Sequence, residues 1–70
     1  MQTKYAIHIF WSDEDDGFVA TCDEFPGLSA FGESREKALE EAQIALDAMI
    51  ETYRASGIDI PEPRSILLAA

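Results

Sequence analysis

The residues of this 70-residue chain that could do chemistry are carboxylates, one thiol and one imidazole. The densest group is a run of four acids, Asp13, Glu14, Asp15 and Asp16. Counted from the first of them, Glu24 occupies the twelfth position, as the last ligand of a calcium-binding loop would. Such a loop also needs a ligand at its fifth position and a glycine at its sixth, where Gly17 and Phe18 stand here. We therefore expect no metal site.

Carboxylates could also hold two Mg²⁺ ions for phosphodiester hydrolysis, but this requires acids that converge from several elements. Four acids in one turn do not converge in this way, and only Asp23 and Glu24 stand near a strand end. The chain has no glycine-rich phosphate loop and no Cys/His spacing suited to zinc. We expect no catalytic residues and no cofactor, and a metal-dependent nuclease stays open as an alternative.

Cys22 and His8 could form a thiolate–imidazole pair if their side chains met. The strand pairing decides this, because residues 4–12 and 18–22 are strand-like and flank the turn at 13–17, which predicts a hairpin. Pairing Ser12 with Gly17 makes one face wholly apolar, and a slip of one residue would lose that segregation. The apolar face would then hold Ile7, Ile9, Trp11, Phe18, Ala20 and Cys22.

The opposite face of this hairpin is mixed in character. It would hold Ala6, His8, Phe10, Val19, Thr21 and Asp23. His8 and Cys22 therefore point to opposite sides, which favours a partly exposed histidine and a buried thiol. Phe10 and Val19 on the mixed face are candidates for self-association.

After the hairpin, a turn at Phe25-Pro26-Gly27 leads to a short strand over 28–31. Ser34 is a good N-cap for a helix over 35–56, and Gly57 is placed to end it. An apolar run over 64–68 predicts a last strand. The order β-β-β-α-β predicts an α+β fold, an antiparallel hairpin sheet of order 3-2-1-4 with one long helix on one face.

The amino-acid composition of the chain limits the kinds of partner that it can bind. Fourteen Asp and Glu against five Lys and Arg give a net charge of −9, which disfavours contact with nucleic-acid phosphates. No apolar stretch is long enough to cross a membrane, no export signal is visible, and one cysteine cannot form an internal disulfide. We expect a cytoplasmic protein. A core this small also predicts a homodimer or higher homo-oligomer, since single domains of this size are marginally stable.

Four motifs follow one another in the chain: Asp16-Gly17-Phe18-Val19-Ala20, Phe25-Pro26-Gly27-Leu28, Gly32-Glu33-Ser34 and Glu36-Lys37-Ala38-Leu39-Glu40-Glu41-Ala42. In this order and spacing they resemble the HicB-like antitoxin family over almost the whole chain. Many such antitoxins continue into a DNA-binding domain, whereas this chain stops after one more strand. We expect a single HicB-like domain over 1–70, with no C-terminal DNA-binding domain and no direct DNA binding.

The resemblance implies a partial RNase H-like fold without catalytic carboxylates. It also implies a partner, a HicA-like toxin that is small, basic and mRNA-cleaving, which the antitoxin neutralises by covering its RNA-binding and active surface. The candidate partner contacts are Asp13, Glu14, Asp15, Asp16, Glu36 and Glu40. The alternatives are a metal-dependent RNase H-like nuclease remnant, and a self-assembling scaffold or small-ligand-binding protein with no toxin partner.

Overall fold

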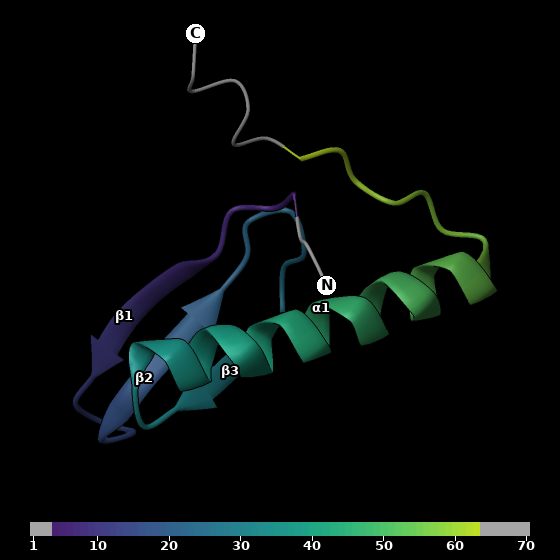
Figure 1. Cartoon of the computed structure of the whole chain (residues 1–70). Helices are drawn as coiled ribbons and strands as arrows, with labels where there is room; N and C mark the ends of the chain where they lie inside the picture. The colour runs from purple at the N-terminus through teal and green to yellow at the C-terminus, as the bar shows by residue number, and fades with distance from the viewer. Residues whose placement is uncertain (1–3, 64–70) are drawn as a thin grey trace, which may run out of the picture.

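The computed structural model describes residues 4–63. Within them it contains three strands and one helix: β1 (His8–Ser12), β2 (Gly17–Thr21), β3 (Ser29–Gly32) and α1 (Arg35–Ser56). The strands form an antiparallel sheet, and α1 lies across one of its faces (Figure 1). The predicted α+β class, with one long helix on one face of an antiparallel sheet, is confirmed.

The strand order over the described residues is β1-β2-β3, and not the four-stranded order 3-2-1-4 that the sequence predicted. β2 lies between β1 and β3, as expected, because consecutive antiparallel strands are neighbours in the sheet. The predicted fourth strand, at 64–68, lies outside the described residues. Residues 58–63, which follow the helix, form no strand.

The strands are also shorter or shifted relative to the prediction. Residues 4–7 are not part of β1, whose last pair with β2 is His8 with Thr21. The reason is that the chain turns directly after β2: the amide of Phe25 donates to the carbonyl of Cys22 at 3.2 Å. This turn removes the partner that residues 4–7 would need. A second turn, closed by the Leu28 amide and the Phe25 carbonyl, starts β3 one residue later than predicted.

The predicted hairpin register is confirmed. Ser12 pairs with Gly17, and Trp11 pairs with Phe18, whose rings meet edge to face at 5.3 Å. The inward face is the one that the alternation of apolar residues predicted. There, Ala20 is fully buried in a small cluster with Ala38 and Ala42 of α1.

Small side chains let the sheet and the helix approach closely at this point. A Cβ on Gly32 would overlap the backbone nitrogen of Ala38 and lie 2.6 Å from the carbonyl carbon of Lys37. Glycine is therefore required at the end of β3, because any larger residue would push the strand off the helix.

The helix bounds agree with the prediction at both ends. The Ser34 hydroxyl accepts a hydrogen bond from the Lys37 amide at 3.1 Å, which caps the first turn. Gly57 has a φ of 72°, in the left-handed region that glycine adopts without strain, and the Ile58 amide donates to the Tyr53 carbonyl. Glu36 in the first turn and Arg54 in the last complement the helix dipole.

The larger part of the core lies beyond the end of the sheet, under the second half of α1. Phe25 is fully buried there, with its ring 5.1 Å from that of Tyr5 and 5.3 Å from that of Tyr53. Leu46 of α1 closes the same cluster. The Tyr5 hydroxyl donates to the Pro61 carbonyl at 2.6 Å, which ties the segment before the sheet to the segment after the helix.

Candidate functional site

The four acids form a defined turn at the tip of the β1–β2 hairpin. The indole nitrogen of Trp11 donates to Oδ1 of Asp13 at 2.7 Å, and the Ser12 hydroxyl donates to Oδ2 of Asp15 at 2.9 Å. Asp16 has a φ of 54°, a left-handed conformation that Asp tolerates better than most residues. All four side chains are exposed, so the tip presents dense negative charge in a fixed shape.

The face of the sheet opposite the helix carries a row of apolar side chains, which we call the open-face row: Phe10, Val19 and Phe31. Phe10 pairs with Val19 across β1 and β2, and Val19 pairs with Phe31 across β2 and β3. Phe10 is 49% exposed and Phe31 is 45% exposed. An aromatic side chain from each outer strand is thus half open to solvent on one flat face.

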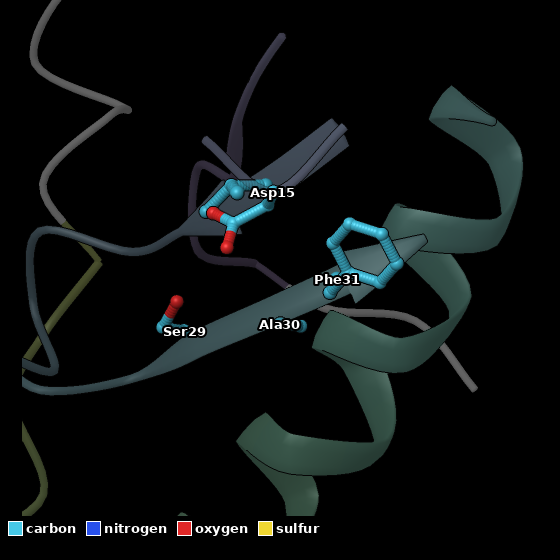
Figure 2. Close-up of a pocket in the computed structure, with 5 residues that line it drawn as sticks. Asp15, Ser29, Ala30 and Phe31 are labelled. Atoms are coloured by element: carbon cyan, nitrogen blue, oxygen red, sulfur yellow. The ribbon is translucent and has the colours of Figure 1, made fainter. Parts of the chain in front are cut away.

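The acidic tip reaches this open face at one point. Asp15, Val19, Ser29, Ala30 and Phe31 line a shallow hollow of about 420 Å³. Figure 2 shows the Asp15 carboxylate and the Ser29 hydroxyl directed into the space above β3, beside the ring of Phe31. A carboxylate therefore stands next to the open-face row, although the two come from different segments of the chain.

The start of α1 lies at the same end of the molecule as the acidic tip. Gly32, at the end of β3, pairs with Phe18 of β2. Phe18 directly follows Gly17, which pairs with Ser12 at the base of the acidic tip. The guanidinium carbon of Arg35 lies 4.8 Å from the centre of the Phe18 ring, which fixes the first turn of the helix against β2.

The two helix acids among the candidate contacts differ in their surroundings. Glu36 is exposed in the first turn. Glu40 forms an ion pair with Lys37, with Nζ and Oε1 3.1 Å apart, and this hydrogen bond is the main cause of a raised pKa of Lys37. Their role in partner contact, like that of the tip acids, stays a prediction.

His8 and Cys22 lie on opposite sides of the sheet, as the register predicted. The His8 imidazole is exposed, with Nε2 3.3 Å from Oδ2 of Asp23. Cys22 is buried, its thiol donates to Oε1 of Glu24 at 3.4 Å, and burial raises the pKa of that thiol. A thiol held in its protonated form and separated from the imidazole by the sheet is a poor nucleophile.

In the part of the chain that the structure describes, no three His, Cys, Asp or Glu side chains come together as metal ligands. None of the helical residues in that part forms a segment long and apolar enough to cross a membrane.

Sequence reasoning placed Phe10 and Val19 on one face but missed Phe31 as their neighbour. The sequence would have indicated Phe31 if a register for β3 had been assumed. Pairing Phe31 with Val19 puts an aromatic residue at each end of the row. Reasoning from the sequence also missed that Asp15 lies beside this row, because the shape of a four-residue turn is not encoded in an alternating pattern. Whether Phe10 and Val19 mediate self-association stays a prediction.

Taken together, the fold and these surfaces define a small acidic α+β domain that presents an exposed face and an acidic rim. Residues 4–67 match the model of the family described as the HicB_like antitoxin of bacterial toxin-antitoxin systems, and the chain belongs to this family. The comparison with curated proteins and the comparison with solved structures gave no match.

Proposed function

We propose that this protein is a non-catalytic antitoxin that binds a small, basic, mRNA-cleaving toxin of the HicA type. It neutralises the toxin by covering the surface with which the toxin binds and cleaves RNA. Membership of the antitoxin family supports a toxin as the partner. The proposal places the protein in the cytoplasm, where such a toxin meets mRNA.

The observation that carries this proposal is the fixed acidic tip. Four exposed carboxylates stand in one hairpin turn held by hydrogen bonds from Trp11 and Ser12. A toxin that holds RNA needs a positively charged surface, because RNA is bound largely through its phosphates. An acidic protein with a net charge of −9 is attracted to the same surface and competes with RNA for it.

The test begins with the reading frame beside the gene of this protein. Its product, if short and basic with one conspicuous histidine, is purified and incubated with a defined mRNA. We expect the product alone to cleave the RNA, and an equimolar amount of this protein to abolish cleavage. Undiminished cleavage at a large excess of this protein would contradict the proposal.

A control separates inhibition from catalysis by this chain. The protein alone is incubated with RNA and with an RNA–DNA hybrid in the presence of Mg²⁺ or Mn²⁺. We expect both substrates to stay intact, and metal-dependent cleavage would favour the nuclease alternative.

A variant with Asp13, Glu14 and Asp16 changed to Asn and Gln should inhibit the toxin less well at low salt. The difference from the wild type should shrink at high salt, since long-range attraction is screened as salt rises.

A further inference from the structure

We propose that the open face of the sheet is the surface on which the basic protein partner docks. The open-face row is buried under the partner, and a Lys or Arg side chain of the partner enters the hollow between Asp15 and Phe31. This inference rests on the proposed function and adds to it the face that makes the contact.

The open-face row has the composition of an interface centre. Phe10 and Phe31 are each about half exposed although both belong to regular strands, where they cost little conformational entropy to bury further. Aromatic residues on rigid elements are common among the few residues that carry most of the binding free energy of an interface. Val19 between them joins the two rings into one apolar strip.

The hollow beside this row has the chemistry that a cationic side chain needs. Ser12 donates to Oδ2 of Asp15 and so holds the carboxylate. Figure 2 shows that carboxylate directed into the space above β3. Oδ1 of Asp15 makes no hydrogen bond to any described residue and can accept one from a partner. A guanidinium or ammonium group placed there would pair with the carboxylate and lie against the Phe31 ring.

Charge decides between a basic partner and a second copy of this chain. Two copies that met face to face would bring together two chains of net charge −9 each, and Asp15 of the acidic tip stands beside the open face in each of them. A basic partner replaces that repulsion with attraction at the same positions. The three apolar side chains then act as the centre of the contact and the tip acids as its rim.

The experiment measures the affinity for the purified toxin, made harmless by replacing its catalytic histidine, by calorimetry. The variants are Phe31→Ser, Phe10→Ser and Asp15→Asn. The matched control is Ile44→Ser, because Ile44 is an apolar residue of α1 that is 60% exposed and lies off the sheet. We expect each Phe variant to bind about tenfold or more weakly and the control to bind as the wild type does. Asp15→Asn should weaken binding at low salt and still weaken it at high salt, because a buried ion pair is screened by salt much less than exposed charges are.

Amide chemical-shift mapping of the wild-type protein on addition of the toxin gives a second readout that needs no folded variant. We expect the chemical-shift changes to gather on β1, β2 and β3 around the open-face row. Wild-type affinity in both Phe variants, or shifts confined to the solvent side of α1, would overturn this inference while leaving the proposed function intact. No binding by the wild type would overturn both. A dimer in sedimentation that Phe31→Ser dissociates would assign the face to a second copy and overturn the inference.

Discussion

The ring of Phe31 lies over Gly17: a Cβ on Gly17 would be 2.5 Å from both Cε1 and Cζ of that ring. The glycine ends the acidic turn, and the ring belongs to the open-face row. An aromatic ring that covers a strand glycine shields the backbone there from water. The position of Gly17 at the end of the acidic turn and the position of the Phe31 ring on the open face therefore depend on each other.

Gly17→Ala is expected to destabilise the fold by about 1 kcal/mol, because the new methyl group forces the Phe31 ring to move. The cost stays small because the ring is half exposed and can turn toward solvent. Urea unfolding measures it. In a Phe31→Ala background the same change should cost clearly less, since the obstructing ring is gone and only the Gly32 carbonyl oxygen, 3.1 Å from the new Cβ, stays close. An equal cost in both backgrounds would show that the ring is not what excludes a side chain at Gly17.

Gly32→Ala should be much more damaging, by about 3 kcal/mol, because the new Cβ would overlap backbone atoms of α1 that cannot move independently. A domain of this size has only a few kcal/mol of stability to lose, so circular dichroism should show a large unfolded fraction. The matched control is Gly27→Ala. Gly27 has a φ of 94° and open space around its Cβ position, so only backbone strain of about 1–2 kcal/mol is expected. Similar losses for the two variants would contradict the steric explanation at Gly32.

Asp16→Gly is expected to stabilise the protein by about 0.5–1 kcal/mol, because Asp16 has a left-handed φ of 54° that glycine adopts without a Cβ clash. The change also removes one of four neighbouring negative charges. Asp16→Asn removes the charge and keeps a residue that tolerates this conformation, so the difference between the two variants isolates the backbone effect. Thermal unfolding at low salt measures both. Equal melting temperatures would mean that charge relief alone explains any gain.

Stability should fall as the pH rises above about 9. Burial is the first cause of a raised pKa for both the Cys22 thiol and the Tyr5 hydroxyl, so each group keeps its proton in the folded state at a pH where the unfolded chain has lost it. Below the ordinary thiol pKa of 9.0 both states are protonated and this contribution is fully present. Above it the unfolded state binds fewer protons, and the free energy of unfolding decreases through the raised pKa.

Urea unfolding at a series of pH values from 7.5 to about 11 checks this dependence. Cys22→Ala removes the thiol titration and should flatten the first part of the decline. Tyr5→Phe should flatten its upper part, and it should also lower stability at neutral pH because the hydrogen bond to the Pro61 carbonyl is lost. An unchanged slope in both variants would assign the alkaline loss to other groups.

The helix and the hairpin register could be predicted from the sequence because each depends on local chemistry. Ser34 and Gly57 have side-chain and backbone properties suited to helix ends, and the alternation around Ile9 and Ala20 permits only one register with an apolar face. These features need no knowledge of distant parts of the chain.

The features that could not be predicted depend on contacts between distant segments. Residues 4–7 look like strand, yet Tyr5 and Ile7 pack against the Phe25 cluster, and the Tyr5 hydroxyl bonds to Pro61, 56 positions away. The place of Asp15 beside Phe31 depends on the conformation of a turn and on the position of β3 together. The fourth strand and the HicA-type partner stay predictions, as does self-association through Phe10 and Val19, which would compete with the partner for the open face.

The close approach of Gly32 to the Ala38 backbone has a consequence for binding. It packs the first turn of the helix directly against the end of the sheet that also carries the acidic turn, which fixes the position of each relative to the other. A protein built in this way is preorganised and loses little conformational entropy when a partner settles across both surfaces. The affinity for the partner would then depend on complementary shape and charge. Association with the partner should be fast, because the protein does not need to rearrange before it binds.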